Sequence, residues 1–165
     1  MNTVISSIAL SISLFAFIFS IFSWIERKRQ DRRDLFLEIN ERLVEIDLQR
    51  GRRIIYRDVH SAEDAEALFR ERPEDYDLAN RALAMLDVAA LYEEQRYIDS
   101  KLFMREWGPV YARIRENSGY FIAQRIARSA APVYPAWPHF QSLARRAAAE
   151  LAWTENRQAA EGVDD

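Results

Sequence analysis

The first 25 residues constrain the fold of this chain more than any other part of it. Residues 4–25 carry no charged side chain, whereas 30% of the whole chain is Asp, Glu, Lys or Arg. At 1.5 Å per residue, these 22 residues would form a helix about 33 Å long, close to the roughly 30 Å thickness of a bilayer's hydrocarbon core. We therefore predict that residues 1–25 form a single transmembrane anchor.

Two alternatives for this segment are a cleaved signal peptide and a buried core helix. A signal peptide begins with basic residues and has a shorter apolar run that ends at a small-residue cleavage site. The first residues, MNT, contain no basic side chain, and no clean cleavage site precedes WIERKRQ. A core helix of this length does not suit a domain of about 140 residues. The transmembrane anchor therefore remains the expected structure.

The charges that follow the apolar segment predict its orientation. ERKRQDRR, residues 26–33, contains five basic residues. Because positive charge is retained on the cytoplasmic side, we expect a single-pass membrane protein with its N-terminus outside and its C-terminal domain in the cytoplasm. The lipid bilayer is thus a predicted partner. The predicted membrane-surface residues are Trp24, Arg27, Lys28, Arg29, Arg32 and Arg33.

Small residues recur along one side of the apolar segment. Their spacing of 3, 4, 3, 4 and 3 residues is a heptad pattern, which lets the backbones of two helices approach closely in lipid. This pattern predicts a seam through which the chain forms a homo-oligomer or docks onto another membrane protein. The alternative is that the serines bond back to the preceding turn and face lipid. The predicted seam consists of Ser6, Ala9, Ser13, Ala16, Ser20 and Ser23.

The remainder of the chain predicts helices throughout. Ala, Leu, Glu and Arg dominate it, and the whole chain has only four glycines and five prolines. We expect an all-α fold, with one N-terminal transmembrane helix continuous with a cytoplasmic bundle of four to five helices. The predicted regions are the anchor at 1–25, a basic exit and long first helix at 26–60, a helical bundle at 61–152 and a polar, frayed tail at 153–165.

Local signals predict where some of these helices begin and end. Ser61 is followed three residues later by an acid, and Asp99 or Ser100 precedes another helical stretch, so we expect helix N-caps at these positions. Gly51 could end or loosen the first helix. ENSG, residues 116–119, is a stop signal in which Gly119 would form a C-cap.

A basic patch in the first helix consists of Arg50, Arg52, Arg53 and Arg57. The stretch 61–106 that follows has twelve acidic residues against six basic ones, so the simplest expectation is a solvated surface whose arginines pair with these acidic helices. The alternative is a site for a phosphate or a lipid headgroup.

The order of segments resembles a family of small bacterial single-pass membrane proteins of unknown function. The resemblance covers most of residues 4–145 and is carried by YIDSKLF after an acid-ended helix, by the helix that contains Trp107, and by a segment with Trp137, Phe140 and Leu143. It implies an N-terminal anchor in the bacterial inner (plasma) membrane and a helical cytoplasmic domain, and it brings no catalytic residues.

The chain contains no recognisable catalytic constellation. It has no cysteine, and its two histidines, His60 and His139, lack the spacing of a metal site. The net charge of −3 argues against a nucleic-acid binder, even though YARIRENSGYF interleaves aromatic residues with arginines. We therefore expect no enzyme activity, no cofactor and no metal.

The sequence thus predicts a membrane-anchored, non-enzymatic helical interaction or scaffold module that self-associates or forms part of a membrane complex. The alternative is a membrane-acting effector or regulator that oligomerises through its transmembrane helix.

Overall fold

The structure is a computed structural model that describes the backbone of residues 2–129 and 136–161 and the side chains of residues 17–129 and 136–158. Within these ranges the chain forms six α-helices and no strand, so the predicted all-α class is confirmed. The helices are α1 (Asn2–Leu43), α2 (Ile46–Asp58), α3 (Ala62–Glu71), α4 (Pro73–Glu94), α5 (Ser100–Arg128) and α6 (Pro138–Glu161).

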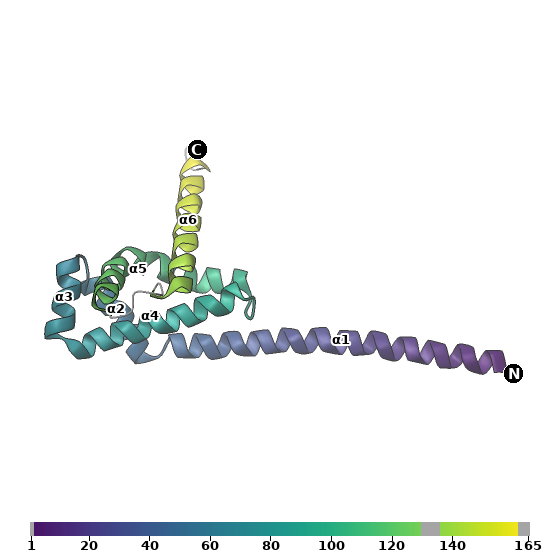
Figure 1. Cartoon of the computed structure of the whole chain (residues 1–165). Helices are drawn as coiled ribbons and strands as arrows, with labels where there is room; N and C mark the ends of the chain where they lie inside the picture. Colours follow the sequence, from purple (N-terminus) through teal and green to yellow (C-terminus); the bar gives the residue numbers. More distant parts are fainter. Residues whose placement is uncertain (1, 130–135, 162–165) are drawn as a thin grey trace.

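Helices α2 to α6 form the bundle, and α1 extends far beyond it (Figure 1). Within the bundle, α2 packs on α4, α5 packs on α6, and α6 also packs on α4. Only the C-terminal end of α1 reaches the core, where Ile39 and Leu43 are buried. The largest fully buried side chains include Phe103, Tyr111, Phe121, Phe140, Leu83 and Leu86.

The predicted transmembrane helix is wrong, and so is the predicted single-pass location in the inner membrane. No helix in the described part of the chain is both long enough and apolar enough to cross a bilayer. In α1 the uncharged run ends at Ile25. Eleven charged residues follow it between Glu26 and Arg42, and their desolvation opposes burial in hydrocarbon.

Two predicted helix caps are confirmed. The Ser61 hydroxyl accepts a hydrogen bond from the backbone N–H of Asp64, at 3.1 Å, and so begins α3. The Asp99 carboxylate accepts one from the backbone N–H of Leu102, at 2.8 Å, and so begins α5. These bonds satisfy N–H groups that have no partner within the helix.

Neither Gly51, which could have ended or loosened the first helix, nor Gly119, which was expected to form a C-cap, ends a helix. The chain leaves its first helix at Val44 and Glu45, whereas Gly51 lies inside α2. A Cβ at residue 51 would overlap the backbone carbonyl of Leu78 and lie 2.9 Å from the Cβ of Ala82. Gly51 therefore serves the close packing of α2 on α4.

Gly119 differs from Gly51, although both lie inside helices. Helix α5 continues through this position to Arg128, and a Cβ at residue 119 would have no neighbour within 4 Å. Similarly, α6 continues to Glu161, which makes residues 153–161 of the expected tail helical; residues 162–165 lie outside the described part.

Helix α4 ends in a turn that places an arginine where glycine is usual. The N–H of Arg96 donates to the Glu93 carbonyl at 3.0 Å, and the N–H of Tyr97 donates to the Tyr92 carbonyl at 2.9 Å. This pair of bonds is a Schellman cap, whose central residue adopts a left-handed backbone. Arg96 has a φ of 58°, a conformation that costs a residue with a Cβ roughly 1–2 kcal/mol.

A buried carboxylate joins three helices of the bundle. Glu93 on α4 is only 2% exposed. It accepts hydrogen bonds from the Arg146 guanidinium of α6 and from the Ser100 hydroxyl of α5. A buried charge is tolerated only when it is paired in this way, so this contact helps to set how α5 and α6 lie against α4.

We predict that alanine has opposite effects at the two helical glycines. Gly51→Ala should lower the free energy of unfolding by about 1–3 kcal/mol, because overpacking against a backbone cannot be relieved by a rotamer change. Gly119→Ala should raise the free energy of unfolding by about 0.5–1 kcal/mol, because alanine loses less backbone entropy in a helix. Urea unfolding followed by circular dichroism measures both. Equal changes in the free energy of unfolding for the two variants would contradict the close contact at Gly51.

We also predict that stability falls at alkaline pH through Tyr111. Burial raises the pKa of this tyrosine well above its ordinary value, and the charges of Asp87 and Glu93 add to the effect. Its hydroxyl donates to the Leu86 carbonyl at 2.7 Å. Above a pH of about 10 the phenol ionises in the unfolded chain but not in the folded one, so the contribution of Tyr111 is complete below that pH and is lost as the pH rises.

The free energy of unfolding, measured from pH 8 to 11, tests this prediction. Tyr111→Phe should lower stability at neutral pH by about 1 kcal/mol, the usual value of one hydrogen bond, and should also flatten the alkaline decline. Tyr120→Phe, which changes an exposed tyrosine of the same helix, should leave the decline unchanged. An alkaline slope that is identical in all three proteins would exclude the role of Tyr111.

Candidate functional site

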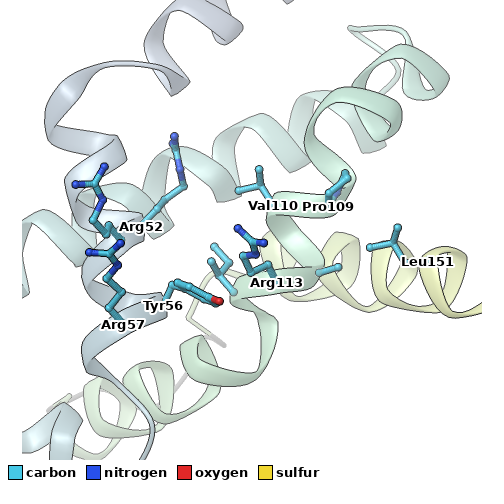
Figure 2. A pocket seen from close by; sticks show the side chains of 10 residues that line it. Arg52, Tyr56, Arg57, Pro109, Val110, Arg113 and Leu151 are labelled. Carbon is cyan, nitrogen blue, oxygen red and sulfur yellow. The ribbon is translucent and has the colours of Figure 1, made fainter. Parts of the chain in front are cut away.

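The candidate site is a groove between α2, α5 and α6, with a volume of about 790 Å³ (Figure 2). We call it the arginine groove. Its polar wall is formed by Arg52, Arg53, Tyr56, Arg57 and Arg113. Its apolar wall includes Pro109 and Val110 of α5 and Leu151 of α6. The lining contains no carboxylate and no imidazole, so its charge is uniformly positive.

The structure divides the predicted basic patch into two parts. Arg50 pairs with Asp75 at 2.8 Å, as expected for a surface that faces the acidic helices. The other three arginines line the groove, and within the described part of the chain none of them forms an ion pair with a carboxylate. Arg50 therefore fits the simpler expectation, whereas Arg52, Arg53 and Arg57 do not.

Arg52 is held in place by the fold itself. Its guanidinium donates to the Leu43 carbonyl at the end of α1, at 2.6 Å, and lies 5.2 Å from the centre of the Trp107 ring. The Trp107 indole in turn donates to the Asn40 side chain of α1 at 3.1 Å. Burial lowers the pKa of Arg52, and the Tyr111 phenol partly offsets this. Arg52 is therefore a structural residue that also contributes positive charge to the groove.

Arg113 is oriented by an aromatic side chain across the groove. Its guanidinium lies 5.1 Å from the centre of the Tyr56 ring. The two residues come from different helices, α5 and α2, and Figure 2 shows them facing each other. A cation placed over a ring loses rotamer freedom but keeps N–H groups free to bind a planar anion.

A side chain of α5 that is not part of the lining links α2 to α5 by hydrogen bonds. The Asn117 amide of α5 donates to the carbonyls of Ile55 and Tyr56, at 3.3 and 3.0 Å, near the end of α2. Carbonyls in the last turn of a helix lack partners within the helix. Asn117 satisfies two of them and so holds the two walls of the groove together.

Arg53 and Arg57 are the least restrained arginines of the groove. Both side chains are exposed, and their guanidinium groups have no hydrogen-bond or ion-pair partner in the described structure. Some other arginines of the bundle do have carboxylate partners: Arg72 bonds Asp58 and Asp75, and Arg146 bonds Glu93. These two arginines are therefore available to an external anion.

Only two residues of the predicted seam have side chains that the structure describes. The side chains of Ser6, Ala9, Ser13 and Ala16 lie outside the described residues, and those of Ser20 and Ser23 are exposed on α1. Association through this seam stays a prediction.

The predicted membrane-surface residues are also exposed on α1. Trp24 is 62% exposed, and the amine of Lys28 lies 5.2 Å from the centre of its ring. Arg29 lies 3.9 Å from the Glu26 carboxylate. Arg27, Arg32 and Arg33 are exposed as well, and a role for the whole set at a lipid surface stays a prediction.

The predicted basic patch contains only three of the ten residues that line the groove. Arg113 belongs to the stretch YARIRENSGYF, in which aromatic residues and arginines are interleaved. Nothing near it in the sequence indicates that it faces Tyr56. No sequence pattern indicates that Leu151 lines the groove. It lies about 40 residues after the groove residues of α5 and joins the lining only because α6 packs on α5.

We predict that two neighbouring arginines differ sharply in their effect on stability. Arg52→Ala should lower the free energy of unfolding by about 2 kcal/mol, because it removes a hydrogen bond from a charged donor and a contact with Trp107. Arg53→Ala should change it by no more than about 0.5 kcal/mol, as expected for an exposed residue. Urea unfolding of the two variants measures the difference, and equal losses would refute the structural role of Arg52.

No family model, curated protein or solved structure matches this chain. The resemblance to small bacterial membrane proteins therefore stays a prediction, and the function has to be inferred from the residues of the groove.

Proposed function

We propose that this chain is a non-enzymatic helical interaction module whose arginine groove docks an acidic, amphipathic segment of a partner protein. The observation that carries the proposal is a groove with four arginines and no carboxylate in its lining. We therefore expect the partner to be negatively charged, because a bound anion reduces the repulsion between these guanidinium groups.

The two walls of the groove support a segment of mixed character. The arginines and Tyr56 offer donors on one side, and Pro109, Val110 and Leu151 offer apolar surface on the other. Guanidiniums bind carboxylates with two parallel hydrogen bonds. A helix or extended peptide with acids on one face and apolar residues on the other would satisfy both walls at once.

The composition of the lining supports binding rather than catalysis. General acid–base chemistry needs a group that can lose or accept a proton near neutral pH. Guanidiniums stay protonated at that pH, and the phenol of Tyr56 is the one other ionisable group in the lining. An arginine-rich surface of this kind is typical of recognition sites for anionic partners.

A peptide-binding measurement tests the proposal. The ligand is a fluorescein-labelled helical peptide with glutamates on one face and leucines on the other, titrated with the full-length protein and followed by fluorescence anisotropy. We expect saturable binding that weakens as salt is added. The triple variant R53A/R57A/R113A, which spares the structural Arg52, should bind at least about tenfold more weakly.

Two controls separate specific docking from general charge attraction. Arg105→Ala removes an exposed arginine of α5 that pairs with Glu106 and lies outside the groove, so it should leave the affinity unchanged. Val110→Asp adds a negative charge to the apolar wall and should weaken binding.

Three results would overturn the proposal. The first is equal binding of a peptide in which glutamine replaces every glutamate. The second is an equal loss of affinity in Arg105→Ala and in the triple variant. The third is a dimer of the wild-type protein, in sedimentation equilibrium, that the triple variant dissolves, because the groove would then be occupied by a second copy of this chain.

A further inference from the structure

A second basic cavity lies where α1 passes the turn between α4 and α5. Its volume is about 330 Å³. The lining consists of Lys28, Asp31, Arg32 and Leu35 of α1 together with Gln95, Arg96 and Tyr97 of the turn. It shares no residue with the arginine groove. We call it the corner cavity.

The corner cavity gathers three cations with little opposing charge. Lys28, Arg32 and Arg96 line it, and Asp31 is its one carboxylate. Counting these side chains, three positive charges less one negative charge leave +2. None of the three cations forms an ion pair within the described residues, although the Lys28 amine lies 5.2 Å from the centre of the Trp24 ring.

The two sides of the cavity are held together by the core. Leu35, which lies in the lining, also packs against the buried residues of the bundle, as does Phe36. One helical turn further on, Ile39 is 2% exposed. The part of α1 that carries Arg32 is thus docked next to the turn that carries Arg96, and the charges are not brought together by flexible segments alone.

The backbone of Arg96 supplies an independent observation. This residue occupies the left-handed position of the Schellman cap, at a φ of 58°. Glycine is the usual residue there, because it adopts this conformation without strain. The chain instead carries an arginine that lines the corner cavity. Strain retained at one residue, next to unpaired charges of the same sign, is typical of a functional position.

We propose that the corner cavity binds a phosphate group through Lys28, Arg32 and Arg96. A phosphate monoester carries about −1.5 to −2 charges at neutral pH, which matches the +2 of the lining. Its tetrahedral oxygens accept hydrogen bonds from several directions, as donors on two sides of a cavity would offer them. The Tyr97 hydroxyl and the Gln95 amide in the same lining can complete the set.

The variant Arg96→Gly separates the role of the side chain in phosphate binding from the loss of stability caused by the strained backbone. Arg96→Gly removes both the cation and the backbone strain. It should raise the melting temperature by about 2–4 °C and weaken phosphate binding at least about tenfold. Arg96→Ala should weaken binding equally without this gain in stability. A purely structural Arg96 could not produce a more stable protein that has lost a ligand.

Isothermal titration of the full-length protein with inorganic phosphate measures the affinity, with sodium chloride at matched ionic strength as the reference. Arg32→Ala should also weaken binding. Asp31→Asn should strengthen it, because it removes the one negative charge of the lining. The triple variant R53A/R57A/R113A should bind phosphate as the wild type does, so failure of this proposal would be distinct from failure of the arginine groove.

Titration with glycerol 3-phosphate identifies the source of the phosphate. Tighter binding of the ester than of inorganic phosphate would assign the cavity to a phosphorylated small molecule or headgroup, and equal binding would assign it to free phosphate. The absence of saturable binding of both ligands to the wild type would overturn the proposal. Undiminished binding to Arg96→Gly, or weaker binding to Asp31→Asn, would also overturn it.

Discussion

Helix α2 can lie directly on α4 because residue 51 has no side chain. The backbone of α4 at Leu78 occupies the space that a Cβ would need. This contact brings the two helices closer than side-chain packing ordinarily allows, and it fixes the rotation of α2 about its own axis. The residues that follow Gly51 are then turned toward α5. The position of the arginine groove depends on this one absent methyl group.

The same packing of helices decides which charged residues of the bundle have ion-pair partners. Arginines that face acidic helices are neutralised locally, as Arg50 is by Asp75 and Arg146 is by the buried Glu93. The arginines of α2 that point away from α4 meet α5, whose facing residues are Arg113 and apolar side chains. Helix packing thus decides which arginines are paired with a carboxylate and which are not. A chain with a net charge of −3 can therefore present a strongly positive groove.

The success of the sequence-based predictions depended on how local each signal was. The caps at Ser61 and Asp99 were predictable, because each involves a side chain and an N–H only three residues away. Gly51 and Gly119 were not, because the same residue type can end a helix, admit a neighbouring helix or merely be tolerated. The reverse holds at Arg96, where a helix ends without the glycine that usually marks such an end. The membrane-spanning helix was predicted from a continuous run of apolar residues, whereas no helix in the described part of the chain is long and apolar enough to cross a bilayer.

By itself, the sequence determined that the chain is helical, where several helices begin, and that its arginines and acids fall in separate stretches. These properties depend on side chains within a turn or two of each other, so they can be read along the chain. Only the tertiary structure decided which charges remain unpaired. Arg53, Arg113 and Leu151 share one groove, and Arg32 and Arg96 share another cavity, because helices far apart in sequence pack at angles set by the shapes of their buried faces. No local pattern encodes those angles, since they result from the whole core being filled at once.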